Sequence, residues 1–425
     1  EDEEEGDNDQ ISQELSPEFC VYNHEDIDEF LQINGIEEFD LLRLNPSISS
    51  LEDIQFGMRL RISDFESATH RKIKLIRRYL PNSSYVGYTA TPFVNLLINT
   101  VTNLSPNNAQ VLQPGTNYTG ASEFFPEDES DLFLKDILSR EIVNLENSNE
   151  YPNSLKTAVR FFIYGVANGI FYKDHEKNNS RSMFVHTSAE VEAETGGYLS
   201  HENIIELINE DINSLKEIFR DLRENQININ EIDELEIFND IHNDLLKTKN
   251  FSNLELIKFN QENIKYFEKA LYFIEIIEFN ARNKSSIPVI NWNEEGYARI
   301  LVGGQGLDRG YTVEGLITSY LLRRPSIQRD TSLQRARFFG YHRNKLNLYR
   351  IFVSQISKEF FRTTINIEKH MRDSISKYLK NNKDLRQWPR IFLTESNDNY
   401  RLTNPNRTNY TMVNNKAYFQ ILYDS

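Results

Sequence analysis

The sequence predicts an α/β fold built on a parallel sheet. Six short runs of β-branched or aliphatic residues are typical of buried strands: 85–88, 181–186, 287–290, 298–302, 316–322 and 348–353. Helix-like segments at 154–171 and 326–339 lie between them. Strands that alternate with helices at this spacing indicate parallel pairing. The length of 425 residues is sufficient for two or three domains with stable cores.

A predominantly helical stretch interrupts this alternation. Apolar residues recur there every three to four positions, as on one face of a helix: Ile204, Ile208, Ile212, Leu215, Phe219 and Leu222. Ser200 is a suitable N-cap for this helix. A second run, 264–279, is apolar on almost every side, so we expect a buried helix there. Together these features predict a helical insertion over 198–282.

The flanking regions show weaker patterns. Residues 70–80 predict a basic amphipathic helix, whereas 93–150 mix short apolar runs with Pro and Asn and predict a partly irregular segment. The C-terminal tail around Trp388 predicts small strands or loops that pack back on the chain.

Composition excludes several classes of protein. A single cysteine, Cys20, rules out a disulfide framework and a zinc site built on several thiolates. No apolar run approaches the roughly 20 residues of a membrane-spanning helix, and no signal peptide opens the sequence, so we expect a cytoplasmic protein. The net charge of −17 argues against a nucleic-acid-binding surface over the whole protein.

One region is nevertheless strongly basic. Residues 321–350 contain eight basic side chains and one acidic side chain, that of Asp330. The basic residues are Arg323, Arg324, Arg329, Arg335, Arg337, Arg343, Lys345 and Arg350. Such a cluster is either a solvated helix face or a local groove for nucleic acid.

Two segments place polar or glycine residues after a predicted strand. Thr89-Ala90-Thr91-Pro92 puts two hydroxyls where parallel sheets bind ligands, although a Thr/Pro turn explains the same residues. Residues 303–315 contain five glycines, which permit either close approach to a ligand or a tight loop. No Gly-Lys-Ser/Thr follows, so this is not a phosphate-binding Walker loop.

Charged residues in two further segments point to nucleotide chemistry. Gln334 and Arg337 are one helical turn apart, and a guanidinium there can stabilise charge on a γ-phosphoryl group, as an arginine finger does. Arg335 points elsewhere and is available to nucleic acid or an acidic partner. Asp2 and Glu3 offer carboxylates for Mg²⁺ and a catalytic water, with a disordered acidic tail as the alternative.

These segments follow the order of motifs III, V and VI of superfamily two helicases. More closely, the chain resembles a bacterial family that is named for endonucleases and built on the Z-one domain. The likeness covers about residues 68–355 without the helical stretch. Its matching blocks are 85–93, 183–188, 303–316, 334–341 and the turn Pro114-Gly115 with Tyr118-Thr119-Gly120 before Phe124-Phe125.

The resemblance implies two RecA-like lobes with ATP and Mg²⁺ between them, in proteins of restriction or phage-defence loci. In the catalytic role it places Arg337, Gln334, Asp2 and Glu3, the last two also as metal ligands. The residues that couple nucleotide to nucleic acid would be Thr89, Thr91, Asp308, Arg309 and Gly310. The nucleic-acid contacts would be Arg335, Arg343, Arg323, Arg324, His186 and Thr187.

This sequence departs from the helicase pattern at three points. Thr312 stands where many helicases carry Asp, and Tyr341 stands at the second motif VI arginine, for which Arg343 is only a candidate substitute. No Walker A sequence occurs in the 425 residues. If Asp2-Glu3 is motif II, the P-loop lies upstream and the chain is a fragment. Because the P-loop cradles the phosphates, we expect this chain alone to hydrolyse no ATP above background.

Nuclease chemistry has little support in the sequence. A metal-dependent nuclease needs clustered carboxylates beside a Lys or His. His175-Glu176-Lys177 has these residue types but is typical of a polar loop, and His201 and His242 lie in the acidic helical stretch. We therefore expect any cutting site elsewhere or in a partner protein of a defence system.

The predicted domains are the end of a first RecA-like lobe over 1–150, a second lobe over 151–360 and a C-terminal extension over 361–425. The leading functional prediction is a fragment of an ATP-driven translocase that acts on nucleic acid, DNA before RNA. The alternatives are a non-catalytic scaffold for a partner protein and a nuclease with an unrecognised site. The leading prediction requires Arg337 to face the same cleft as Thr89 and Thr91.

Overall fold

In a computed structural model, the chain divides into two compact units. The first unit comprises Glu1–Ala109, Lys377–Ser396 and Arg401–Ser425, and the second comprises Gln110–Ser376 and Asn397–Tyr400. The structure describes residues 19–21, 27–34, 36, 38–45, 48, 50–55, 58–62, 68–80, 82–97, 105–126, 128, 130–177, 179–187, 197–279, 290, 292, 296–304, 313–326, 328–380, 384–388, 391–393, 400, 402, 411–413 and 416–418.

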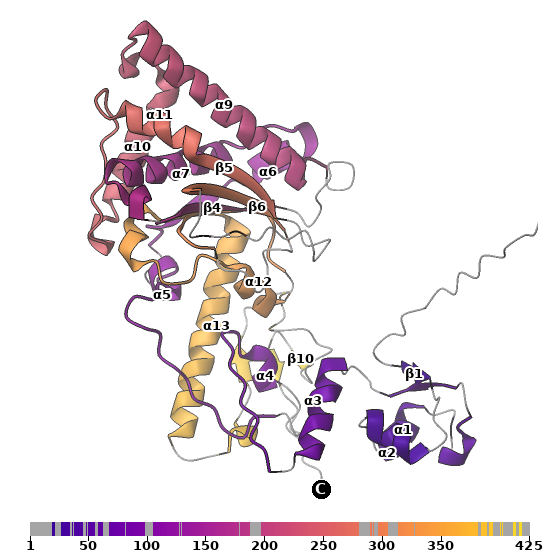
Figure 1. Cartoon of the computed structure of the whole chain (residues 1–425). Helices are drawn as coiled ribbons and strands as arrows, with labels where there is room; N and C mark the ends of the chain where they lie inside the picture. The colour runs from indigo at the N-terminus through magenta and orange to yellow at the C-terminus, as the bar shows by residue number, and fades with distance from the viewer. Residues whose placement is uncertain are drawn as a thin grey trace, which may run out of the picture. The chain divides into compact units, whose positions relative to one another are not determined.

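An all-parallel sheet of six strands forms the centre of the second unit (Figure 1). Its strand order is β3-β8-β7-β4-β6-β5. The strands are β3 (Leu134–Ile137), β4 (Arg181–His186), β5 (Ile274–Phe279), β6 (Ala298–Gly303), β7 (Leu316–Leu321) and β8 (Arg350–Ser354). The strands β4, β6, β7 and β8 are buried along their whole length, as expected for parallel strands covered on both faces.

The parallel α/β sheet predicted from the sequence is therefore confirmed. The predicted strands 181–186, 298–302, 316–322 and 348–353 correspond to β4, β6, β7 and β8. The run 287–290 lies outside the described residues except for Ile290.

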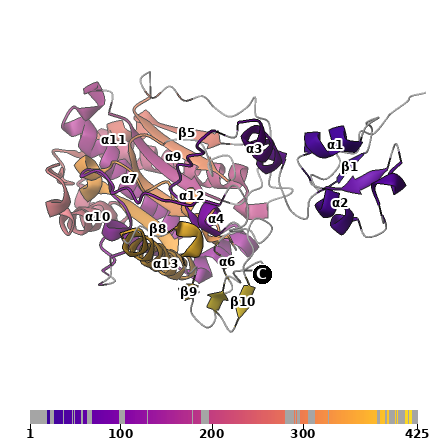
Figure 2. The same ribbon diagram turned by 90° about the horizontal axis from the view of Figure 1, so that it is seen from below.

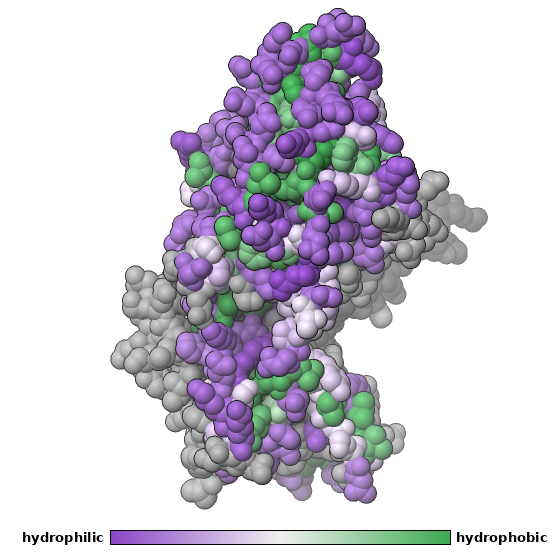
Figure 3. Space-filling model, turned by 90° about the vertical axis from the view of Figure 1, so that its left-hand side faces the viewer, coloured by the Kyte–Doolittle hydropathy of each residue, from purple (hydrophilic) through white to green (hydrophobic). Residues whose placement is uncertain are grey.

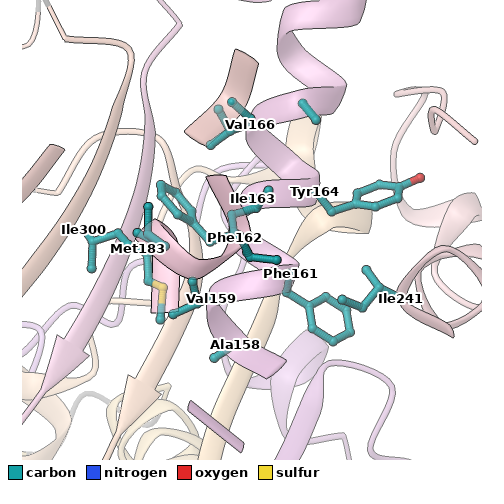
Figure 4. Close-up of a cluster of buried hydrophobic side chains, with 14 of the residues drawn as sticks. Ala158, Val159, Phe161, Phe162, Ile163, Tyr164, Val166, Met183, Ile241 and Ile300 are labelled. Atoms are coloured by element: carbon teal, nitrogen blue, oxygen red, sulfur yellow. The ribbon is translucent and has the colours of Figure 1, made fainter. Parts of the chain in front are cut away.

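The helix α7 (Asn153–Phe171) confirms the prediction at 154–171, and most of its residues are buried on every face of the helix. Figure 4 shows Phe162 directed toward Met183 of β4 and Ile300 of β6, whereas Phe161 is directed toward Ile241. A helix that is apolar on all sides requires a second covering layer beyond the sheet.

That layer consists of α9 (His201–Asn225), α10 (Ile237–Leu246) and α11 (Ile264–Phe273). The helix α9 begins at the predicted N-cap, where Ser200 Oγ accepts a hydrogen bond from the Asn203 amide (3.3 Å). All six residues of its predicted apolar stripe are buried. The helix α9 packs on β5 and β6, whereas α10 and α11 pack on α7.

The prediction of one helix over 264–279 is wrong for its second half. The helix α11 ends at Phe273, and the next six residues form β5, the edge strand paired with β6. Ile274, Ile276 and Ile277 are β-branched and favour an extended backbone, whose polar groups β6 satisfies. The stretch 198–282 is thus a part of the sheet and of its core rather than a purely helical insertion.

The opposite side of the sheet carries α12 (Arg329–Arg335) and α13 (Gln355–Leu379) (Figure 1). Lys358 of α13 donates to Asp131 (2.9 Å) and Asp136 (2.6 Å), which ties this helix to β3. The helices α5 (Ala121–Phe124) and α6 (Ser139–Ser148) add regular structure within 93–150, where we expected a partly irregular segment.

The first unit contains short elements. The helix α3 (Ala68–Tyr79) confirms the prediction at 70–80, and β1 (Phe19–Val21) pairs antiparallel with β2 (Arg59–Arg61) beside α1 (Ile27–Asn34) and α2 (Glu38–Leu44) (Figure 2). The tail forms an antiparallel sheet of β9 (Ile391–Leu393), β10 (Thr411–Val413) and β11 (Lys416–Tyr418). These pairings confirm the prediction of small strands in the tail, and the burial of Trp388 is consistent with a tail that packs back on the chain. The short helix α4 (Phe93–Leu97) completes this unit.

Hydrophilic side chains predominate on the face shown in Figure 3, with hydrophobic ones in small groups between them. Among the described helices, none combines the length and the apolar character needed to cross a membrane.

Candidate functional site

Three neighbouring strands of the second unit end together at the carboxyl edge of the sheet. They are β7, β4 and β6, and each is followed by residues singled out from the sequence. The Thr187 amide after β4 donates to the Gly303 carbonyl of β6 (3.2 Å). The Arg323 amide after β7 donates to the His186 carbonyl of β4 (3.3 Å). These bonds hold the three strand ends in one row, at the edge where open α/β sheets bind ligands.

His186 and Thr187 lie beneath this edge. His186 is 3% exposed and shares a sheet face with Phe184, whose ring centroid is 5.6 Å from the imidazole. Thr187 is completely buried. We therefore expect both side chains to pack in the interior and to hold the strand ends in place. Their contact with nucleic acid stays a prediction.

The glycine-rich segment connects the carboxyl end of β6 to the start of β7. Gly303 and Gly304 are buried, whereas 305–312 lie outside the described residues, and with them Asp308, Arg309 and Gly310. The segment returns at Gly315, whose carbonyl accepts from the Ser182 amide (2.9 Å). Gly315 has a φ of 68°, and a Cβ there would lie 2.0 Å from the Ser180 carbonyl oxygen, so the position requires glycine.

The segment with Gln334 and Arg337 differs from the predicted helix 326–339. The helix α12 ends at Arg335, and Ala336 leaves the helical conformation with ψ of 72°. Gln334 and Arg337 therefore do not share a helix face, because Arg337 lies beyond the last turn. Ala336 and Phe338 are buried while Arg337 is half-buried, and the chain turns here, because the Phe339 amide donates to the Ala336 carbonyl (3.4 Å).

The chain is anchored before Gln334, at the start of α12, and after Arg337, at Gly340. At the first point, the buried guanidinium of Arg329 donates to Thr364 Oγ1 and the Phe360 carbonyl of α13, and it lies 5.1 Å from the centroid of the Phe360 ring. At the second point, Gly340 and Thr119 exchange two backbone hydrogen bonds of 3.0 and 2.6 Å. The segment 334–340 is thus held in one position relative to α13 and to the turn at 119.

The Thr119–Gly340 pairing brings together two blocks of the sequence that are far apart along the chain. Phe124 packs against Phe338 with ring centroids 5.7 Å apart, and Tyr118 meets Tyr341 at the same distance. Arg343 forms an ion pair with Glu123 (2.8 Å). The local sequence pattern contains no signal for this contact, because it depends on the return of the chain across the sheet.

A sequence model of a known family matches residues 154–396, and its description is "Z1 domain". The match covers more than half of the chain and includes five of the six strands of the parallel sheet. The chain belongs to the Z1 domain family. No curated protein and no solved structure shows significant similarity to it.

Within this Z1 domain, the basic cluster 321–350 divides into anchoring and surface groups. Arg350 has a fully buried side chain that pairs with Asp244 of α10 (2.7 Å), and Arg329 is anchored on α13. Burial, and then the neighbouring Arg181, lower the pKa of Lys345 to about 8. Nearer the surface are Arg324, which is exposed, and the half-buried Arg323, Arg335, Arg337 and Arg343. The charge that faces solvent is therefore smaller than the eight basic residues indicate.

Thr89 and Thr91 belong to the first unit, upstream of the Z1 match. The predicted strand at 85–88 is wrong: no described strand pairs with this segment, and Tyr85, Val86 and Tyr88 are 51, 65 and 87% exposed. A strand requires a partner for its backbone groups. The Thr91 amide donates to Thr89 Oγ1 (3.1 Å), which gives a local turn.

The proposed metal ligands Asp2 and Glu3 lie outside the described residues. Within the part of the chain that the structure describes, no three His, Cys, Asp or Glu side chains gather into a possible metal site. His175 is directed toward the rings of Phe273 and Tyr297, with centroids 5.8 and 5.7 Å away, so it belongs to an aromatic cluster.

Proposed function

We propose that this Z1-domain chain is part of an ATP-dependent nucleic-acid translocase or remodelling protein of helicase type, which acts in restriction or phage defence. The observation that carries the proposal is the row of strand ends β7, β4 and β6, which lines up Arg323, His186 with Thr187, and Gly303 with Gly304. Ligands of parallel α/β proteins bind at this edge.

In this proposal, the anchored segment 334–340 presents Gln334 and Arg337 to the γ-phosphate of ATP. Because the segment is fixed at Arg329 and at Gly340, the Arg337 guanidinium would need little reorganisation to meet that charge. The phosphates and Mg²⁺ would be held by a P-loop outside the 425 residues together with Asp2 and Glu3. ATP hydrolysis would supply the energy for movement. Thr89, Thr91, Asp308, Arg309 and Gly310 would couple it to nucleic acid.

Nucleic acid is assigned in this proposal to the surface arginines of the Z1 domain. Arg324 is exposed, and Arg323, Arg335 and Arg343 are half-buried. Their guanidinium groups suit phosphate, and a local basic surface is compatible with the net charge of −17.

The test is binding of fluorescently labelled DNA to the purified chain over a range of salt concentrations, with and without Mg²⁺. We expect the logarithm of the binding constant to fall linearly with the logarithm of salt concentration, because phosphate contacts release counterions. Absence of binding at low salt would contradict the proposal and favour a scaffold for a partner protein. Mg²⁺-dependent cleavage of plasmid DNA would favour a nuclease instead.

A further inference from the structure

Tyr341 combines high exposure with a fixed position. Its side chain is 70% exposed, yet it follows Gly340, whose backbone is paired with Thr119. The Tyr341 ring meets the Tyr118 ring edge-on, with centroids 5.7 Å apart and an interplanar angle of 77°. A Cβ on Gly115 would lie only 3.3 Å from the Tyr341 hydroxyl. The ring is therefore held from two sides while most of its surface faces solvent.

Each of the two paired segments carries an exposed apolar side chain. Among the described residues of the second unit, the two most exposed large apolar side chains are Tyr341 (70%) and Leu112 (65%). They lie on the two segments that the Thr119–Gly340 pairing joins. An exposed aromatic ring that its neighbours hold in place is available for stacking on a planar ligand.

Two arginines flank the tyrosine pair, each above a more buried glutamate. Arg343 is 38% exposed and its partner Glu123 is 16% exposed. Arg372 of α13 is 38% exposed and its partner Glu368 is 18% exposed. Both members of this second pair are near Tyr118, whose pKa is raised by burial and then by Glu368. In each pair the guanidinium is the more exposed member and the carboxylate is the more buried one, so the guanidinium is the group that a ligand in solution reaches first.

We infer that Tyr341, supported by Tyr118, is a stacking platform for a base of single-stranded nucleic acid, with Arg343 and Arg372 on the adjacent phosphates. This inference rests on the proposed function and adds a contact residue to it. Aromatic side chains stack on any base, and fixed guanidinium groups follow the backbone. The bases of a duplex are already stacked on one another and cannot occupy the ring.

The test compares binding of a labelled oligothymidylate to the wild-type chain and to tyrosine variants. Tyr341→Ala should weaken binding by about 5- to 100-fold, whereas Tyr341→Phe should stay within about twofold of wild type, because a phenyl ring also stacks. Tyr272→Ala is the matched control. Tyr272 is 63% exposed on α11, so its loss removes a similar ring from another surface without an effect on binding.

Salt dependence separates stacking from charge. The slope of log affinity against log salt should be unchanged in Tyr341→Ala and reduced by about one in Arg372→Gln. If the wild-type chain binds the oligonucleotide and Tyr341→Ala binds equally well, the inference is overturned while the proposed function stands. If the wild-type chain binds no nucleic acid at low salt, both are overturned.

Discussion

Gly315 determines how the chain enters β7. Its φ is positive, and a Cβ at this position would lie 2.0 Å from the Ser180 carbonyl oxygen, which excludes other residues. We expect Gly315→Ala to lower the free energy of unfolding by about 2–5 kcal/mol, because backbone strain adds to overpacking. Urea unfolding measures this. Gly197 is the control, since its φ is 57° but no atom lies within 4 Å of such a Cβ, so Gly197→Ala should lose only about 1–2 kcal/mol. Equal losses would contradict this account.

His342 gives the stability of the fold a pH dependence. Burial, and then Lys345, lower the pKa of His342 to about 4, and its ring packs on Tyr349 with centroids 5.2 Å apart. The unfolded chain protonates this histidine near pH 6.5, so it binds more protons than the folded chain between pH 6.5 and 4. Stability should therefore fall as the pH falls through this interval.

The corresponding variant is His342→Phe, which keeps a ring on Tyr349 but does not titrate. We expect its unfolding free energy to change less than that of wild type between pH 6.5 and 4. Urea unfolding at several pH values measures the difference, and parallel curves for His342→Phe and wild type would refute the assignment.

Between elements, a buried ion pair joins α7 to α9. Arg160 of α7 has no exposed surface, and its guanidinium donates to the carboxylate of Asp211, whose side chain is 6% exposed. We expect Asp211→Ala to lower the free energy of unfolding by about 3–5 kcal/mol, because a buried cation loses its main partner. Asp221 is exposed on the same helix, so Asp221→Ala should change stability by less than about 0.5 kcal/mol. A loss below about 1 kcal/mol for Asp211→Ala would disprove this role.

Sequence patterns predict two kinds of element: helices with one buried face, and helices or strands that are buried along their whole length. The stripe of α9 and its Ser200 cap are visible because one helix face repeats regularly. The edge strand β5 is hidden, since a continuous apolar run from 264 to 279 fits a buried helix as well as a helix followed by a strand. The strand β3 is short and carries Lys135 and Asp136, so only its pairing with β8 reveals it.

At the scale of the whole molecule, the sequence predicts which strands form the parallel sheet, but it does not predict where α12 ends. The strand ends of β4, β6 and β7 meet as parallel pairing requires. The early end of α12 is not predictable, because the pairing of Gly340 with Thr119, 221 positions away, draws the chain out of the helix. Arg337 belongs to the second unit and Thr89 and Thr91 to the first, so their common cleft stays a prediction.

The most direct test of the nucleic-acid proposal is the salt dependence of DNA binding by the double variant Arg335→Gln, Arg343→Gln. Each lost phosphate contact reduces the slope of log affinity against log salt by about one, so we predict a slope about two smaller than that of wild type. The control is Arg220→Gln, Arg223→Gln, which removes two exposed arginines from α9 and should leave the slope unchanged. A wild-type slope in the Arg335, Arg343 variant would contradict the assignment of this surface to nucleic acid.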